Sequence, residues 1–274
     1  MTHAFDHSRL ADALLPAVLA AGDVLLRHFR TQLTVERKAD ASPVTAADRA
    51  AEAVLLEALA RAAPGVPVIA EEAVAAGQIP DIGDAFFLVD ALDGTREFIA
   101  GGTEFTVNVG FVTGGVATFG MVFAPILRRL YATPWPDRAV EARPRIGAAA
   151  SRLADLDPSA IRTRPPDPAA LTALVSRSHT EAAVGDRLAQ FARATFRPVA
   201  SSLKFCLVAR GEADLYPRLK PTSEWDTAAG HAILGAAGGI VTTLDGLPLE
   251  YGKVDRHFEN PAFVAWGRAP AVDW

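Results

Sequence analysis

One stretch constrains this chain more than any other, because an apolar run leads directly into two acids. Residues 86–98 read Phe-Phe-Leu-Val-Asp-Ala-Leu-Asp-Gly-Thr-Arg-Glu-Phe. The run predicts a buried strand, and Gly94-Thr95 predicts a helix start just beyond it. Asp90 and Asp93 lie three residues apart at this junction and can share hard cations, while unpaired amides at a helix start can hold an anion. The stretch therefore predicts metal ions held against a phosphate.

The composition indicates a large buried core and no general attraction to polyanions. The chain has 274 residues, of which 50% are hydrophobic, so it suits one large or two modest globular domains, and we favour two. A formal net charge of −5 gives no overall attraction to nucleic acid or anionic lipid. Any phosphate ligand must therefore be neutralised locally, by metal ions or by a few basic side chains.

The cysteine content and the N-terminal segment indicate a cytoplasmic protein. The single cysteine, Cys206, cannot form an internal disulfide and is expected to be a buried packing residue. Apolar residues from Leu10 to Phe29 recur at helical spacing and are interrupted by Pro16, which favours an amphipathic helix over a signal peptide. No run approaches the roughly 20 apolar residues of a transmembrane segment. Association with a membrane surface and a homodimer stay open.

The predicted elements divide the chain near residue 145. The first half is expected to hold helices and a largely antiparallel sheet. From residue 134 to residue 168, seven prolines interrupt a weakly periodic stretch that marks a domain junction. The second half alternates strand and helix, as α/β domains do. We therefore expect an N-terminal α+β domain over 1–145 and a C-terminal α/β domain over 146–274.

Periodicity and turn residues place the individual elements. Helices are expected over 8–30, from 45, from 181, over 201–211 and over 223–237. Strands are expected over 34–38, 66–70, 106–112, 116–123, 174–176, 196–199, 214–216, 240–243 and 262–266, with an edge strand over 129–133.

Three further acids lie at the edges of predicted elements. Glu71 ends the strand over 66–70, and Asp226 lies near the start of the helix over 223–237. Asp48 takes the third helical position after Thr45, so helix capping is its ordinary interpretation. Solvated surface is the ordinary interpretation of Glu71, and a favourable acid near a helix start is that of Asp226. Together with the acids of the central stretch, Glu71 and Asp226 also match the oxygen ligands that Mg²⁺ prefers. The spacing of these acids alone leaves both interpretations open, an ordinary structural role and metal binding.

Four separated blocks together resemble the inositol monophosphatase superfamily of Mg²⁺-dependent, lithium-sensitive phosphatases. The blocks are Pro43-Val44-Thr45-x-x-Asp48, Glu71-Glu72, Asp90-x-x-Asp93-Gly94-Thr95 and Trp225-Asp226-x-Ala228-Ala229. They follow one another in the family's order across nearly the whole chain. The resemblance implies a layered α-β-α-β-α sugar-phosphatase-type fold, with a mainly antiparallel N-terminal sheet and a smaller α/β C-terminal domain.

Several other runs resemble one branch of that superfamily, the 3'(2'),5'-bisphosphate nucleotidases. These runs are Glu97-Phe98, 102–108, 176–179, 201–206, 213–218 and Asn260-Pro261. The branch implies hydrolysis of 3'-phosphoadenosine 5'-phosphate to AMP and phosphate. The expected ligand is thus a small bisphosphorylated nucleotide, with no nucleic acid partner.

The resemblance also implies how two to three Mg²⁺ ions are held at the site. Asp90 would bridge two ions, with Glu71 and the Leu92 carbonyl completing the first site and Asp93 with Asp226 completing the second. Glu71 would also face a third ion that is rich in water ligands. Such an arrangement activates water on one side and neutralises the departing ester oxygen on the other.

Catalysis and phosphate binding would fall to residues next to those ligands. The resemblance implies that Thr95, held by Asp48, orients the attacking water, so Asp48 would both cap its helix and act in the site. Glu71 completes the catalytic set. The amides of Gly94 and Thr95 would hold the phosphate oxygens.

Substrate recognition would come from the second half of the chain. The resemblance places a set of residues around the ribose, the base and the second phosphate: Ser176, His179, Ala200, Lys204, Tyr216, Arg218 and Asp226. Ordinary alternatives exist for three of them. His179 could cap the following helix, Lys204 could be a solvated helix residue, and Tyr216 could be core with its hydroxyl paired.

The chain departs from the branch pattern at three positions. Ala200 stands where glycine is usual, and its methyl could hinder close approach of a nucleotide to the backbone. Ala91 stands where proline is usual, which removes no ligand, and Arg210 stands where an acid is common. Only the change at Ala200 bears on substrate fit.

Three rival functions are weighed against this one. A haloacid-dehalogenase-type phosphatase needs its second acid two residues after the nucleophile, whereas Asp90 and Asp93 are three apart. Inositol monophosphate or fructose 1,6-bisphosphate hydrolysis would use the same fold and site. A catalytically silent nucleotide sensor would need the metals but not Glu71, Asp48 and Thr95 together.

Overall fold

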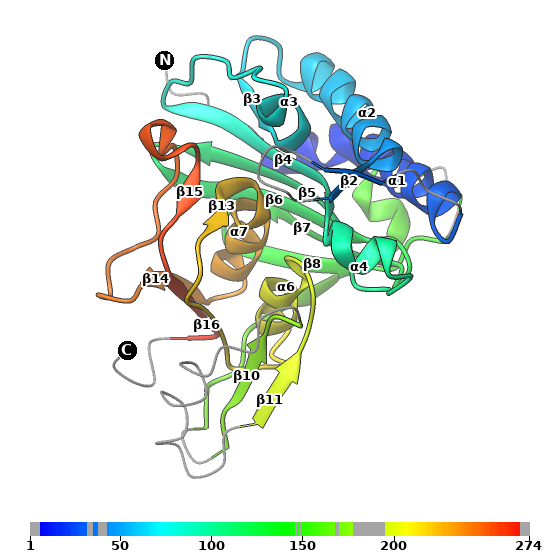
Figure 1. Cartoon of the computed structure of the whole chain (residues 1–274). Coiled ribbons are helices and arrows are strands. Elements are labelled where there is room, and N and C mark those ends of the chain that lie inside the picture. Colours follow the sequence, from blue (N-terminus) through cyan, green and yellow to red (C-terminus); the bar gives the residue numbers. More distant parts are fainter. Residues whose placement is uncertain are drawn as a thin grey trace.

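A computed structural model describes residues 6–31, 35–37, 43–145, 147, 150–167, 170–177 and 195–268. Its main features are two β-sheets of seven and five strands with helices between them and on the outer face of the larger sheet (Figure 1). None of the helices within these ranges is both long and apolar enough to cross a membrane.

The larger sheet is antiparallel except at one edge, where its first two strands run parallel. Its order is β3 (Val68–Ala70), β4 (Ala85–Asp93), β5 (Thr106–Thr113), β6 (Val116–Ala124), β7 (Arg129–Trp135), β8 (Arg138–Ala142) and β9 (Ser159–Ile161). Strand β4 is almost continuously buried, because helices cover both faces of the sheet, and this explains its unbroken apolar run.

One expectation about this sheet was wrong. The strand over 129–133 is not at an edge, because β7 lies between β6 and β8. The weakly periodic stretch from 134 to 168, for which no strand was predicted, contains β8 and β9. Strand β8 buries four of its five residues, and a strand that short is too brief to show a clear alternation.

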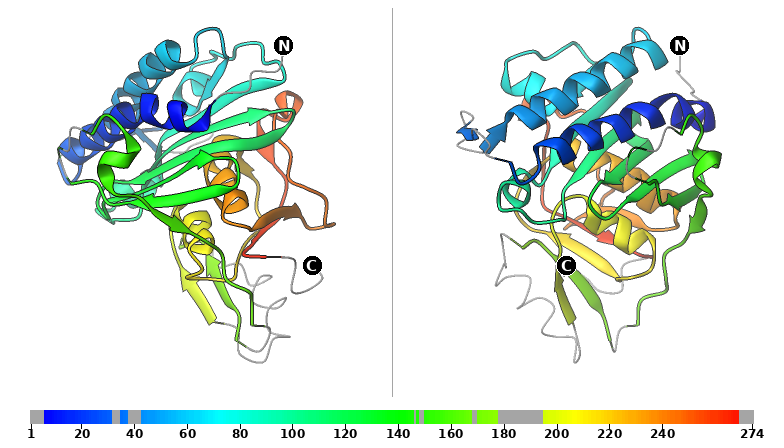
Figure 2. Two further views of the ribbon diagram at one scale, coloured as in Figure 1. Left: turned by 180° about the vertical axis from the view of Figure 1, so that it is seen from behind. Right: turned by 90° about the vertical axis from the view of Figure 1, so that its right-hand side faces the viewer.

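Two long helices cover the outer face of the larger sheet. They are α1 (His7–His28) and α2 (Ala46–Ala62), which lie side by side in Figures 1 and 2. The Asp6 carboxylate caps α1 by accepting from two backbone amides. Thr45 and Asp48 form the capping box that starts α2, as expected. The helix expected over 8–30 therefore begins and ends within two residues of the prediction.

The opposite face of the larger sheet carries α6 (Leu203–Ala209) and α7 (Ala228–Ala236), which lie between the two sheets (Figure 2). Helix α7 rests directly on the sheet backbone at Gly110 and Gly120. A methyl group at Gly120 would lie 2.2 Å from the Ala229 carbonyl oxygen, so only glycine allows this approach. The residues before α7 form the 3-10 helix η2 (Glu224–Asp226) rather than its first turn.

The smaller sheet mixes parallel and antiparallel pairs. Its order is β11 (Thr195–Pro198), β10 (Thr172–Val175), β12 (Leu215–Arg218), β16 (Phe263–Trp266) and β14 (Ile240–Thr243). The remaining elements are β1 (Val35–Arg37), β2 (Pro43–Thr45), α3 (Glu71–Ala75), α4 (Thr95–Ile99), η1 (Leu153–Leu156), β13 (Thr222–Ser223), η3 (Val254–Arg256) and β15 (Glu259–Asn260).

The layers run helices, larger sheet, helices, smaller sheet, which confirms the expected fold class. The helix expected from residue 181 falls outside the described residues. The domain division near residue 145 stays a prediction. The larger sheet continues to Ile161, and one core cluster contains residues from both halves of the chain, such as Leu88 and Phe205.

Candidate active site

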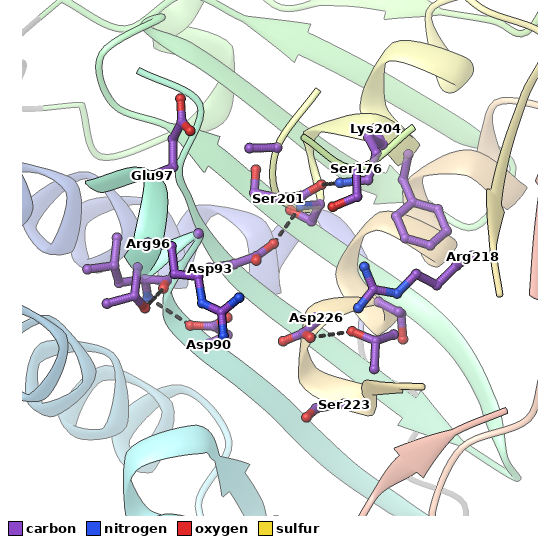
Figure 3. Close-up of a pocket in the computed structure, with 18 of the residues that line it drawn as sticks. Asp90, Asp93, Arg96, Glu97, Ser176, Ser201, Lys204, Arg218, Ser223 and Asp226 are labelled. Carbon is purple, nitrogen blue, oxygen red and sulfur yellow. Dashed lines mark hydrogen bonds between the residues drawn. The ribbon is translucent and has the colours of Figure 1, made fainter. Parts of the chain in front are cut away.

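A cavity of about 620 Å³ opens where β4 ends, and both sheets contribute to its walls (Figure 3). Almost every residue that the sequence singled out lines it. The lining set includes Glu71, Asp90, Leu92, Asp93, Gly94, Thr95, Ser176, Ala200, Lys204, Tyr216, Arg218 and Asp226. Asp48 lies behind Thr95, and His179 lies outside the described residues. The cavity therefore assembles segments that are far apart in the sequence.

Three carboxylates meet at one wall of this cavity. Glu71, Asp90 and Asp226 each offer an oxygen, and these oxygens lie within 4.8 Å of one another. Glu71 begins α3, Asp90 lies in β4 and Asp226 ends η2. Burial, together with repulsion from Glu71, Asp93 and Asp226, raises the pKa of Asp90 well above its usual range. Burial, Asp93 and Glu71 raise the pKa of Asp226 to about 8.

Acids crowded in this way favour a bound cation. The donors are all hard oxygens, which fits Mg²⁺ better than a soft metal. The Leu92 carbonyl lies on the same wall, 3.1 Å from the Thr95 hydroxyl. The donor set thus agrees with a magnesium centre.

Backbone and side-chain contacts fix each acid of the group. Asp90 accepts from the Leu92 amide at 2.8 Å, and Asp226 accepts from the Thr222 hydroxyl at 2.5 Å. The Glu52 carboxylate accepts from the amides of Glu72 and Ala73 at 2.8 and 3.0 Å. Glu52 therefore anchors the first turn of α3, where Glu71 lies. The sequence analysis missed Glu52, which shows no local signal beyond its position on a helix.

Asp48 divides its two oxygens between two partners. One oxygen accepts from the amide and the hydroxyl of Thr45 at 2.8 and 2.6 Å, which completes the helix cap. The other oxygen lies 3.2 Å from the Thr95 hydroxyl. Asp48 thus caps α2 and also contacts Thr95, so the two interpretations of this residue are compatible.

Asp93 lies on the same cavity but outside the group of three carboxylates. It accepts a short hydrogen bond from the Ser202 amide and longer ones from Asn108 and Thr106, at 3.4 and 3.5 Å. Burial raises the pKa of Asp93, and nearby Lys204 opposes this rise. The contacts of Asp93 therefore run toward α6 and β5.

Lys204 and Tyr216 form the wall opposite the acids. Only 3% of Lys204 is exposed, so its interpretation as a solvated helix residue is wrong. Its ammonium donates to the carbonyls of Ser201 and Val199 at 2.6 and 3.3 Å and lies 4.9 Å from the centre of the Tyr216 ring. Burial lowers the pKa of Lys204 to about 8. Tyr216 packs edge-on against Phe205, so it is a core residue that also lines the cavity.

The segment around Ala200 is held by a hydrogen bond to a carboxylate that also forms an ion pair. The Glu104 carboxylate accepts from the Ala200 amide at 2.9 Å and pairs with Arg177 at 3.0 Å. The left-handed residue of this segment is Ser201, with a φ of 56°, and Ala200 is not among the positive-φ residues. The methyl of Ala200 thus causes no left-handed backbone strain. Arg218 donates to two backbone carbonyls, those of Lys220 and Pro221.

Several known proteins with similar sequences carry the same name. The chain is 39% identical over 252 residues to the 3'(2'),5'-bisphosphate nucleotidase CysQ of Shigella flexneri, which covers 89% of this chain and 94% of that protein. It is 40% identical over 249 residues to the enzyme of that name from Salmonella typhimurium, with the same coverage.

Solved structures agree with these relatives. The crystal structure of CysQ from Bacteroides thetaiotaomicron, described as a bacterial member of the inositol monophosphatase family, matches with a TM-score of 0.77. It is 33% identical and covers 95% of this chain and 97% of that one. A model of the inositol monophosphatase family matches residues 6–270. On its sequence, its fold and the layout of its acids, this chain belongs to the inositol monophosphatase family.

Proposed function

We propose that this protein is a Mg²⁺-dependent 3'(2'),5'-bisphosphate nucleotidase that hydrolyses 3'-phosphoadenosine 5'-phosphate to AMP and phosphate. The observation that carries the proposal is the group of three carboxylates, within 4.8 Å of one another, on a cavity with basic side chains across from it. The names of its relatives support the choice of substrate. The two sides suit a metal-bound phosphate and a second phosphate, respectively.

The acids would hold two to three Mg²⁺ ions. Glu71 and Asp90 with the Leu92 carbonyl suit one ion, and Asp90, Asp93 and Asp226 suit another. When bound, Mg²⁺ neutralises phosphate oxygens and makes a nearby water more acidic.

The chain's own residues would orient the reacting groups. The Thr95 hydroxyl can donate to Asp48, which leaves its oxygen lone pairs to accept from the attacking water and aim it. Gly94 has a left-handed φ of 95°, which turns the chain so that its amide and that of Thr95 reach phosphate oxygens in the cavity. Water then attacks the 3'-phosphorus in line, the bond from phosphorus to the 3'-oxygen breaks, and that oxygen takes up a proton, so AMP and phosphate are released without a covalent enzyme intermediate.

The second wall would bind the rest of the nucleotide. Lys204 and Arg218 are cations on the cavity, and they suit the second phosphate, with Ser176 and Tyr216 beside the sugar or base. His179, outside the described residues, keeps its proposed place near a phosphate. Cations on the cavity in addition to the metal-binding acids suit a substrate with a second phosphate better than inositol monophosphate.

Phosphate release from three substrates tests the proposal. We expect 3'-phosphoadenosine 5'-phosphate to be hydrolysed at least tenfold faster, in kcat/KM, than inositol 1-phosphate or fructose 1,6-bisphosphate. The activity should need Mg²⁺, disappear with a chelator and fall on addition of Li⁺. Equal rates on all three substrates would refute the nucleotide assignment alone, whereas Mg²⁺-independent turnover would refute the metal centre as well.

The proposal includes a setting for the enzyme. A buried, unpaired Cys206 is compatible with a reducing cytoplasm, where a small nucleotide substrate would occur. A homodimer is part of the same proposal. Light scattering tests the dimer, and cell fractionation tests the location and any association with the membrane surface.

A further inference from the structure

A buried polar cluster joins the end of β4 to the start of α6. Its members are Asp93, Thr106, Asn108 and Ser202. Thr106 and Asn108 lie on β5, whereas Ser202 comes from the second half of the chain and directly precedes α6. Thr106, Asn108 and Ser202 are 0%, 1% and 3% exposed. Polar groups buried this deeply need defined hydrogen-bond partners, so the pattern of bonds in the cluster carries information.

The Ser202 hydroxyl sets the orientation of the Asn108 amide. It donates to Asn108 Oδ1 at 2.7 Å and lies 2.9 Å from the Thr106 hydroxyl. With its oxygen accepting from Ser202, Asn108 turns its NH₂ group to Asp93 Oδ2, 3.4 Å away. A rotated amide would instead place its oxygen against the Asp93 carboxylate, which is unfavourable.

All the donors to Asp93 within the described part of the chain reach the same oxygen. The Ser202 amide, Asn108 and Thr106 each contact Oδ2. This concentrates the protein contacts on one side of the carboxylate and leaves Oδ1 for a ligand in the cavity. Contacts of this kind fix the rotamer of a metal ligand and tune its affinity for the ion.

We propose that Ser202 is a positioning residue that holds Asp93 for the second Mg²⁺ ion, through its own amide and through Asn108. The proposal rests on the magnesium centre of the proposed function. Ser202 also connects the position of that ion with the cavity wall opposite the acids, because Ser202 belongs to the segment 199–204, which carries Ala200 and Lys204. Glu104 holds the same segment through the Ala200 amide.

Mg²⁺ binding to the substrate-free protein, followed by calorimetry, tests this role. Ser202→Ala removes the hydroxyl and keeps the amide. We expect the weaker Mg²⁺ step to lose about tenfold or more in affinity, within the range known for such outer contacts, and the tighter step to stay within about twofold. Thr163→Ala is the matched control, because it removes another buried hydroxyl, bonded to the Ala237 carbonyl at 3.3 Å. Both of its Mg²⁺ affinities should equal those of the wild type.

A second variant keeps the test decisive if Ser202→Ala folds poorly. Asn108→Ala should weaken the same Mg²⁺ step, and the double variant should be hardly worse than Asn108→Ala alone, since the Ser202 hydroxyl acts through Asn108. Unchanged Mg²⁺ affinity in either single variant, or fully additive losses, would overturn the proposal. This experiment contains no nucleotide. An unexpected result would therefore count against the role of Ser202 and not against the proposed substrate.

Discussion

The Asp48 carboxylate divides its two oxygens between a helix cap and the Thr95 hydroxyl. The cap could be predicted from local sequence, since Thr45 and Asp48 have the spacing of a capping box. The contact with Thr95 spans 47 positions, and only the resemblance to a family pointed to it. Ser202 and Asn108 lie in runs that resemble the nucleotidase branch, but their role could not be predicted, because their bonds to Asp93 form only when β4, β5 and α6 meet in the folded chain.

Replacing Asp48 by asparagine should separate its two roles. Asparagine can also cap a helix, so we expect a modest loss of stability but a fall in kcat of about 100-fold or more, because Thr95 loses the acceptor that orients it. Steady-state kinetics and thermal melting measure the two effects. Asp155→Asn is the control, since Asp155 also accepts from the backbone amide three residues before it, at the start of η1, but is not among the residues that line the cavity. A kcat for Asp48→Asn within threefold of the wild-type value would mean that Asp48 only caps α2 and has no role in catalysis.

Lys204 should make substrate affinity depend on pH. Its pKa is about 8 in the folded protein, so its positive charge is present below that pH and is lost above it. We therefore expect the KM for the bisphosphorylated nucleotide to rise between pH 7 and pH 9. In Lys204→Met the KM should be about tenfold higher at pH 7 and should lack this rise. The exposed Lys220, changed to methionine, is the control. A KM for Lys204→Met equal to that of the wild type would exclude substrate contact.

At the scale of elements, most strands could be predicted, including β14 and β16 far from the site, whereas β8, β9 and the position of β7 within its sheet could not. Strands β4, β5 and β6 have long apolar runs bounded by turn residues, and they occur where expected. Strand β7 was placed at an edge, although four of its residues, from Leu130 to Thr133, are fully buried. Its Pro134 lies in a register shift with β8, so the proline marks an irregular pairing rather than an edge.

The packing of α7 on β5 and β6 should control the place of Asp226. A methyl at Gly120 would meet the Ala229 carbonyl, so Gly120→Ala must push α7 from the sheet and carry Asp226 with it. We expect a loss of about 1–3 kcal/mol in stability and a higher Mg²⁺ requirement for activity.

Gly235→Ala is the matched control for the displacement of α7 in Gly120→Ala. It lies in the same helix, and a methyl there meets no atom within 4 Å. This variant should be unchanged or more stable by up to about 1 kcal/mol, with normal Mg²⁺ dependence. Normal Mg²⁺ dependence in Gly120→Ala as well would show that Asp226 is not positioned by this contact.

At the scale of the whole molecule, the acids make the metal-free protein sensitive to pH. The pKa of Asp226 rises from 3.8 to about 8 on folding, so the folded state binds a proton more tightly than the unfolded state. In a chelator, the contribution of Asp226 to the free energy of unfolding is therefore greatest below about pH 4, and it falls as the pH rises toward 8. Mg²⁺ competes with that proton, so stabilisation by Mg²⁺ should grow over the same range.

Thermal melting of the wild type and Asp226→Asn in a chelator measures this effect. We expect the difference in Tm, variant minus wild type, to increase from pH 5 to pH 8, because asparagine carries no charge to repel Glu71 and Asp90. A constant difference would mean that Asp226 does not titrate in this range.

The layered fold and the reaction type could be predicted because they depend on motifs within single elements. The substrate was predicted only through the resemblance to the nucleotidase branch, because Lys204, Tyr216 and Arg218 meet the acids only across the interface between the two sheets. Lys204 lines the cavity although only 3% of it is exposed, a combination that the sequence could not show.

The rate of phosphate release by Asp90→Asn at saturating Mg²⁺ tests the central claim most directly. Asp90 is the buried member of the carboxylate group, and in the metal-free protein its charge is repelled by three other acids. We predict that turnover of 3'-phosphoadenosine 5'-phosphate falls by at least about 1,000-fold, while helicity is kept and the metal-free Tm is equal to or higher than that of the wild type. Retained turnover, or lost activity together with lost helicity and a lower Tm, would contradict a metal centre built around Asp90.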